Sequence, residues 1–123
     1  MFLARTSGCN VTGVDINENG IRDAERLAVQ GDPLDRTKFR QTDGSRRLPF
    51  AGDSFDALIS NDAMCHIPNR ARVLRAWFRV WKPGGRMLFT DAMVITGLIS
   101  KEEIATRSRI GDYCFYPPGR MNV

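Results

Sequence analysis

The sequence has few of the residues from which metal sites and disulfide frameworks are built. It contains one histidine and three cysteines in 123 residues, and the cysteines are far apart, at Cys9, Cys65 and Cys114. A structural zinc site needs about four Cys or His ligands at short spacings, and a disulfide framework needs an even number of cysteines. We therefore expect reduced, mostly buried thiols and no bound metal.

Long hydrophobic runs are also lacking. No run approaches the ~20 apolar residues of a membrane-spanning helix. The opening MFLARTSGCN has no apolar segment of the kind that a secretory signal requires. A hydrophobic content of 42% with 26% charged residues is typical of a globular chain. These observations predict a cytoplasmic protein that has no membrane partner.

The charge balance gives little support to nucleic-acid binding. The formal net charge is +4, and arginine far outnumbers lysine. A nucleic-acid-binding surface usually concentrates its basic residues on one patch. Here the arginines are scattered singly among acids and apolar residues, as in IRDAERLA and RVLRAWFR. We interpret them as solvated helix faces and expect no nucleic-acid partner.

Strand patterns alternate with helix patterns along the whole chain. Apolar runs predict strands at residues 10–15, 37–43, 55–61 and 86–95. Apolar residues at helical spacing predict helices after Asn17 and from about Asn69 to Lys82, each with an asparagine as N-cap. A helix end is expected at residues 1–8, a turn at KPGG (82–85) and a further helix after Ser100. Such alternation predicts a parallel sheet covered on both faces.

Polar side chains stand where these strands end. Ligands of open α/β sheets bind at the carboxyl ends of the strands, and this sequence has acids or amides there: Asp15, Asp43, Asn61, Asp62 and Asp91. A carboxylate in the position of Asp15 can accept hydrogen bonds from both hydroxyls of a ribose. It can equally stabilise the start of the next helix through the helix dipole. The pattern alone leaves both interpretations open.

Three segments in order carry a more specific signal: GVDIN, then TDGSRRLPFAGDSFDALISNDAMCHI, then RVWKPGGRMLFTD. Together they resemble the class I S-adenosylmethionine-dependent methyltransferases, in the type 11 small-molecule group. The resemblance covers residues 1–95, and residues 96–119 resemble the substrate-side insert of sarcosine- and dimethylglycine-type methyltransferases. It implies an α/β fold with a Rossmann-like parallel sheet, incomplete, containing the family's second to fifth strands. Residues 1–123 would be one partial methyltransferase domain.

The resemblance assigns residues to the cofactor S-adenosylmethionine. Asp15 would hold the ribose hydroxyls, Ile16 would pack on the adenine, and Asn17 would lie beside it. Asp43 would accept a hydrogen bond from the adenine amino group. Gly44 would allow the ligand to approach the backbone closely.

Asn61 would lie near the methionine part of the cofactor, and His66 would face the active site. Methyl transfer from a sulfonium is an in-line displacement that needs no enzymic nucleophile, and orientation can supply up to about 7–11 kcal/mol. A base is needed only where the acceptor must lose a proton, and His66 is the candidate catalytic residue because its unperturbed pKa lies near neutrality. A structural or site-lining role for His66 is the alternative. Asp62 is a weaker candidate for contacting a cationic amine, and Met64 and Cys65 are expected to pack.

The sequence departs from the family because the glycine-rich first motif is absent. In the family the first strand lies between the second and the fourth, so the four remaining strands should form two separate pairs. Unpaired interior edges favour association, and we expect the chain by itself to self-associate and to bind the cofactor weakly. The expected activity is methyl transfer to a small-molecule acceptor, such as an amine. The alternatives are a non-catalytic interaction module of this fold and a nicotinamide-dependent oxidoreductase that uses Asp15 for ribose.

Overall fold

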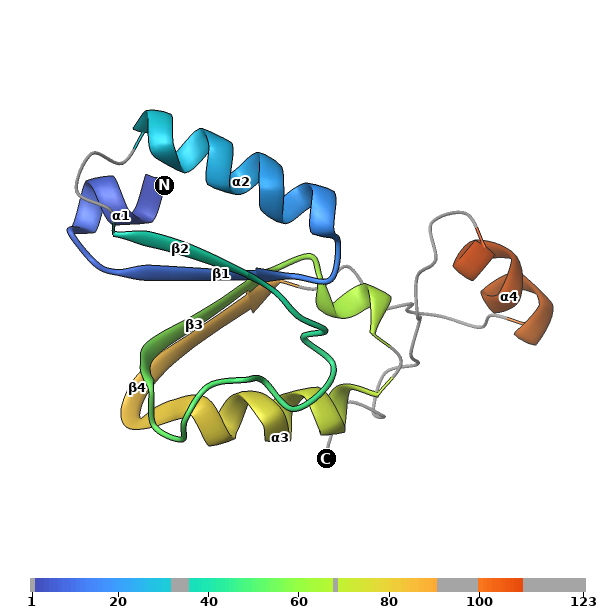
Figure 1. Cartoon of the computed structure of the whole chain (residues 1–123). Helices are drawn as coiled ribbons and strands as arrows, with labels where there is room; N and C mark the ends of the chain where they lie inside the picture. The colour runs from blue at the N-terminus through green and yellow to red at the C-terminus, as the bar shows by residue number, and fades with distance from the viewer. Residues whose placement is uncertain (1, 32–35, 68, 91–99, 110–123) are drawn as a thin grey trace. The chain divides into compact units, whose positions relative to one another are not determined.

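The structure is a computed structural model that describes residues 2–31, 36–67, 69–90 and 100–109 (Figure 1). Its contacts divide the chain into two compact units, Met1–Pro49 and Phe50–Val123. Helices and strands alternate in both units, and the two strand pairs within these ranges are parallel. The predicted α/β class with a Rossmann-like, incomplete parallel sheet is therefore confirmed.

The first unit contains α1 (Phe2–Ser7), β1 (Val11–Asp15), α2 (Glu18–Gly31) and β2 (Thr37–Gln41). β1 and β2 pair in parallel from Val11 with Thr37 to Asp15 with Gln41, and α2 contacts both strands (Figure 1). Gly13 pairs with Phe39, and a Cβ at Gly13 would lie 2.7 Å from the Phe39 ring. Glycine is needed there because the aromatic ring covers the backbone.

Local signals set the limits of α2 as the sequence predicts. The Asn17 side-chain oxygen accepts hydrogen bonds from the backbone amides of Asn19 (2.9 Å) and Gly20 (3.4 Å), as an N-cap does. Ile21 and Ala28 are buried, which places the inner face of the helix as expected. Leu27, predicted for the same face, is 48% exposed. Leu27 is more exposed because, at about 100° per residue, it lies roughly 120° around the helix axis from the buried Ile21.

α1 ends at a glycine, also as predicted. Gly8 has a φ of +68°, and its amide donates to the carbonyl oxygen of Ala4 at 3.1 Å. This left-handed conformation just past the last helical residue is common in helix termini because glycine adopts it without steric cost.

The second unit contains β3 (Phe55–Asn61), the 3₁₀ turn η1 (Met64–His66), α3 (Arg70–Val80), β4 (Trp81–Thr90) and α4 (Lys101–Arg109). β3 is the strand predicted at 55–61. β3 and β4 pair in parallel, and the register runs from Ala57 with Arg86 to Asn61 with Thr90. The Ser100 hydroxyl accepts the backbone amide of Glu103 at 3.1 Å, so the predicted cap of the last helix is confirmed.

The start of β4 corrects the sequence prediction. The strand was expected at 86–95, after a turn at 82–85, but β4 begins at Trp81, which pairs with Phe55. Residues 82–85 form an irregularity within the strand, opposite Asp56 alone. Gly84 has a φ of +76°, and a Cβ at Gly85 would lie 2.6 Å from the Asp56 carbonyl oxygen. Gly84 and Gly85 thus allow the backbone to form a bulge in β4. The rest of the predicted strand, residues 91–95, lies outside the described ranges.

α3 begins as predicted and ends two residues early. The Asn69 side chain accepts the backbone amide of Arg72 at 3.0 Å, which confirms the N-cap, and the helix ends at Val80 rather than Lys82. Its most deeply buried side chains are Val73 and Val80, both 0% exposed. The other apolar residues of the predicted stripe, Leu74, Trp77, Phe78 and Trp81, are less buried, and Phe78 is 59% exposed.

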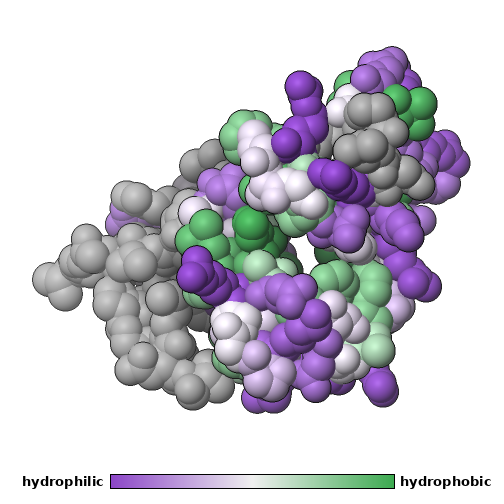
Figure 2. All heavy atoms as spheres, turned by 90° about the vertical axis from the view of Figure 1, so that its left-hand side faces the viewer, coloured by the Kyte–Doolittle hydropathy of each residue, from purple (hydrophilic) through white to green (hydrophobic). Residues whose placement is uncertain are grey.

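The four described strands form two separate two-stranded sheets, β1 with β2 and β3 with β4. This arrangement confirms the expectation of two pairs. Several apolar side chains of these strands are exposed: Val14 (42%), Ile59 (56%), Leu88 (62%) and Phe89 (40%). Hydrophobic side chains are visible at the surface in Figure 2, in green.

Candidate functional site

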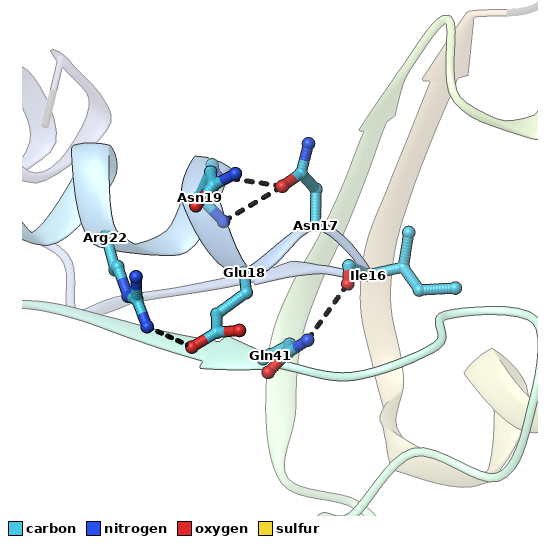
Figure 3. A network of polar contacts seen from close by, with 7 residues as sticks. Ile16, Asn17, Glu18, Asn19, Arg22 and Gln41 are labelled. Atoms are coloured by element: carbon cyan, nitrogen blue, oxygen red, sulfur yellow. Dashed lines mark hydrogen bonds and ion pairs between the residues drawn. The ribbon is translucent and has the colours of Figure 1, made fainter.

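In the first unit, Asp15 ends β1, and Asp43 lies two residues past the end of β2, at the same edge of the sheet. Asp15 pairs with Gln41, and the Thr42 amide donates to the Asp15 carbonyl oxygen at 2.8 Å. The Gln41 side chain donates to the Ile16 carbonyl oxygen at 3.2 Å, which ties the two strand ends together (Figure 3). Asp43 follows one residue after Thr42, so two of the predicted cofactor carboxylates belong to one edge of this sheet.

Only one of the two carboxylate oxygens of Asp15 accepts a hydrogen bond from the described part of the chain. Oδ1 accepts the backbone amide of Asn17 at 2.9 Å and so holds the turn into α2. Oδ2 makes no hydrogen bond within the described ranges, and a Cβ at Gly20 would lie 3.4 Å from it. Asp15 is exposed. It therefore supports the helix start, as the structural interpretation expects, and still has acceptor capacity for a ligand.

Ile16 and Asn17 follow at the entrance to α2. The Ile16 side chain is 66% exposed, and Figure 3 shows it directed away from the polar network formed by Asn17, Glu18 and Arg22. Asn17 uses its carboxamide oxygen for the cap. An exposed isoleucine next to a carboxylate suits the predicted contact with adenine, and that contact stays a prediction.

Asp43 is anchored by its own loop. Oδ1 accepts hydrogen bonds from the Ser45 hydroxyl (2.6 Å) and the Ser45 amide (2.9 Å). Oδ2 accepts a hydrogen bond from the Arg46 side chain (2.9 Å). These bonds, led by the Ser45 hydroxyl, lower the pKa of the Asp43 carboxyl below its ordinary value. Asp43 is therefore an anionic acceptor at neutral pH.

Gly44 is not required by the packing of the chain itself. A Cβ added there would meet no atom within 4 Å, and Gly44 is not among the glycines with positive φ. The backbone at this position is therefore open to a ligand, in contrast to Gly13 and Gly85, which neighbouring side chains or carbonyls cover.

In the second unit, the carboxyl ends of β3 and β4 are joined by a small polar cluster. The Thr90 hydroxyl lies 2.8 Å from Oδ1 of Asn61 and 3.0 Å from Oδ1 of Asp62. The Asp62 amide donates to the Thr90 hydroxyl (2.9 Å) and to its carbonyl oxygen (3.2 Å). Asp62 adopts a φ of +48°. Thr90 was not among the residues predicted for the site, because the strand was expected to continue past it to residue 95.

His66 is the last residue of η1, which begins at Met64, two residues after Asp62. Met64 and Cys65 are each 1% exposed, so the prediction that they pack is confirmed. The Cys65 thiol donates to the Asp62 carbonyl oxygen at 3.0 Å, which links the turn to the end of β3. The His66 side chain is exposed, and its amide donates to Ala63. Its catalytic role stays a prediction.

In the part of the chain that the structure describes, no group of three or more His, Cys, Asp or Glu residues could hold a metal ion. Among the described helices, none is long and apolar enough to cross a membrane.

Comparisons with known proteins identify the family. The family model described as Methyltransferase domain matches residues 1–89. Methyltransferase GfsG from Streptomyces halstedii is 37% identical over 106 residues, which are 85% of this chain and 36% of that protein. Glycine/sarcosine/dimethylglycine N-methyltransferase from Actinopolyspora halophila is 39% identical over 94 residues, 75% of this chain and 16% of that protein.

A solved structure agrees. A Galdieria sulphuraria protein, provisionally assigned as a sarcosine dimethylglycine methyltransferase, superposes with a TM-score of 0.84 at 25% identity, over 96% of this chain and 44% of that one. The chain therefore belongs to the methyltransferase domain family, within the class I S-adenosylmethionine-dependent methyltransferases. That the four strands are the second to fifth of that fold stays a prediction from the resemblance. These comparisons favour neither the oxidoreductase nor the non-catalytic alternative.

Proposed function

We propose that the protein transfers a methyl group from S-adenosylmethionine to a small-molecule acceptor. The observation that carries this proposal is the hydrogen bond from the Thr42 amide to the Asp15 carbonyl, which brings Asp15 and Asp43 to one sheet edge. Two carboxylates at adjoining strand ends suit a ligand with both ribose hydroxyls and an exocyclic amine. The family match and the relatives' names supply the reaction.

In this proposal the adenosine part of the cofactor lies against the β1–β2 edge. Oδ2 of Asp15 accepts from the ribose hydroxyls while Oδ1 keeps the turn. Asp43 accepts from the adenine amino group, and Ile16 covers the adenine face. Gly44 leaves room for that approach. The assignment of Asn61 to the methionine part stays a prediction from the resemblance, and S-adenosylmethionine itself supplies the activated methyl group.

For the acceptor we propose an amine, and for His66 the role of a base or substrate contact. Support comes from relatives whose names include glycine, sarcosine and dimethylglycine as substrates, one of them from Halorhodospira halochloris at 33% identity over 93 residues. The chain spans 36% and 39% of the first two relatives that it matches, so the acceptor is a proposal for the whole protein. A cytoplasmic location is part of the same proposal.

Fold alone does not determine this chemistry. The [4+2]-cyclase SpnF superposes with a TM-score of 0.72 at 24% identity, which is evidence of a shared fold only. A direct test is therefore needed. The protein should be incubated with methyl-labelled S-adenosylmethionine and glycine, sarcosine or dimethylglycine. Labelled product with one of these amines supports the proposal, and label transfer to none of them contradicts the amine assignment.

Cofactor binding can be tested independently of the acceptor. S-adenosylhomocysteine should bind in a calorimetric titration, whereas NAD should not. Asp15→Ala should weaken binding by about 1.5–3 kcal/mol, the value of hydrogen bonds to a charged group. Asp15→Asn, which keeps an oxygen for the Asn17 amide, separates ligand binding from the turn. Asp23→Ala removes an exposed acid of α2 and is the matched control.

Unchanged affinity in both Asp15 variants would limit Asp15 to its role at the start of α2. Binding of NAD in preference to S-adenosylhomocysteine would support the oxidoreductase hypothesis instead.

We also propose that the protein self-associates. β1 and β3 each have one strand partner among the described residues. Ile59 and Leu88 are register partners on neighbouring strands, and they expose 56% and 62% of their surfaces. An apolar pair beside an edge without a strand partner favours contact with another chain.

A further inference from the structure

The helix α3 carries its arginines without any acidic residue. Arg70–Val80 contains four arginines and no aspartate or glutamate, and two of the arginines, Arg70 and Arg72, lie in the first turn. Cations at this end of a helix face the positive end of the helix dipole, which is unfavourable. By contrast, α2 and α4 both have acidic residues in the first turn. The charge on α3 therefore does not serve the stability of the helix itself.

Two of the four arginines are held within the fold, and two are not. Arg70 is only 9% exposed, and Arg79 Nη1 donates to the Phe50 carbonyl oxygen at 2.8 Å. Arg72 and Arg75 are exposed. Within the described ranges their side chains make no hydrogen bond or ion pair. These two guanidinium groups are the ones that α3 offers to a partner.

The exposed arginines stand in one row with two aromatic rings. Arg72, Arg75 and Phe78 follow one another at spacings of three residues, which places them on a single ridge of the helix. Phe78 is 59% exposed, and its ring centroid lies 5.3 Å from that of Trp81, three residues further on. We call these four residues the outer ridge of α3. Its first half is cationic, and its second half is aromatic.

The composition of the outer ridge indicates which partner would fit it. Side chains three residues apart on a helix have Cβ atoms about 5–6 Å apart, so the two arginines match carboxylates one helical turn apart on a facing helix. Arginine and aromatic residues are enriched in protein–protein interfaces. A lipid surface fits less well, because the apolar side of α3, at Val73 and Val80, is buried in the protein. Nucleic-acid binding usually neutralises more phosphates than two arginines contact.

We propose that the outer ridge of α3 docks an acidic helical segment of a partner protein. Two carboxylates of that segment, one turn apart, pair with Arg72 and Arg75, and an aliphatic side chain on its next turn covers Phe78. Charge complementarity carries the assignment, since the first half of α3 has positive charge that no acidic residue of the helix offsets.

A second copy of this chain suits the outer ridge less well than a different protein. Two acidic residues of α2 are already paired within that helix, Glu18 with Arg22 and Asp23 with Arg26. The same pairs make Arg22 and Arg26 the matched control, because they are exposed helix arginines that already have carboxylate partners.

The test measures the fluorescence anisotropy of two labelled peptides. The first is an alanine-rich helical peptide of about 18 residues, with two glutamates one turn apart and a leucine on the next turn of the same face. The second has glutamines in place of the glutamates. The protein should bind the glutamate peptide more tightly than the glutamine peptide. Added salt should weaken binding of the glutamate peptide.

Variants assign this binding to the outer ridge. Arg72→Gln and Arg75→Gln should each weaken binding of the glutamate peptide about 2- to 5-fold, the range of exposed ion pairs, and should reduce its dependence on salt. Phe78→Ala should weaken binding and leave the salt dependence unchanged. The control, Arg22→Gln combined with Arg26→Gln, should leave the affinity unchanged. Circular dichroism of each variant establishes that the fold is retained.

Three results would overturn this inference. Equal affinity for the two peptides, or an equal loss in the α2 control and in Arg72→Gln combined with Arg75→Gln, would show that the ridge is only a solvated face. Tighter binding of a labelled oligothymidylate, lost in the same α3 variants, would identify a nucleic-acid surface instead. A fall in the mass measured by light scattering in the α3 double variant, without peptide binding to the unaltered protein, would make a second copy the occupant.

Discussion

The two valines of α3 offer the sharpest test of how the second unit is packed. Val73 and Val80 are both 0% exposed, and they lie two turns apart on one face of the helix. Val→Ala removes the equivalent of two methylene groups, worth about 1.6 kcal/mol at ~0.8 kcal/mol each. The cavity left behind adds to that cost. Alanine is the better helix former, which offsets the loss by up to about 0.7 kcal/mol.

The expected net result for Val80→Ala is therefore a loss of about 1–2 kcal/mol in the free energy of unfolding. Val29 is the matched control, because it is also in a helix but is 86% exposed. Val29→Ala removes the same atoms and should be neutral or slightly stabilising, since only helix propensity changes. Each variant should be unfolded in urea and followed by far-ultraviolet circular dichroism, to which both helices contribute.

A difference of less than about 0.5 kcal/mol between Val80→Ala and Val29→Ala would refute the packing described for α3. The half-buried Trp77 gives a second comparison. Complete burial of a tryptophan would make Trp77→Ala cost about 3–5 kcal/mol. Because Trp77 retains partial exposure, we expect a smaller loss.

Three further predictions follow from the turn at Asp43, the bulge in β4 and the exposed apolar pair. The lowered pKa of Asp43 means that its bonds stabilise the fold above the unfolded pKa of about 3.9, and that this stability disappears as pH falls through the lower folded value. Asp43→Asn should therefore flatten the loss of stability on acidification in urea melts between pH 5 and 2, and an unchanged slope would contradict the role of its hydrogen bonds. Gly85→Ala should cost about 1–3 kcal/mol because its Cβ would collide with a carbonyl oxygen, whereas Gly44→Ala should leave the melting temperature unchanged. Equal effects would show that the bulge relaxes. Leu88→Lys should reduce the mass measured by light scattering toward that of a monomer, and Val29→Lys should not; a monomeric unaltered protein would end the self-association proposal.

Much of the local structure could be predicted from sequence because local interactions determine it. Asn17 and Asn69 are N-caps because each bonds amides two or three residues further along the chain. Gly8 ends a helix because it can adopt positive φ. The placement of Asp15 and Asn61 at strand ends followed from the alternation of strands and helices, and the structure has both there. β2 ends at Gln41 rather than at the predicted residue 43, so Asp43 lies in the loop that follows the strand.

The tertiary structure decided what depends on contacts between segments distant in sequence. The sequence suggested a turn at 82–85, but pairing of Trp81 with Phe55 converts it into a bulge of β4. Burial of α3 at Val73 and Val80 depends on which side of the helix meets other elements. Thr90 lies beside Asn61, which is 29 residues away in the sequence, only because β3 and β4 pair in parallel. The pairing brings Thr90 Oγ1 to 2.8 Å from Asn61 Oδ1.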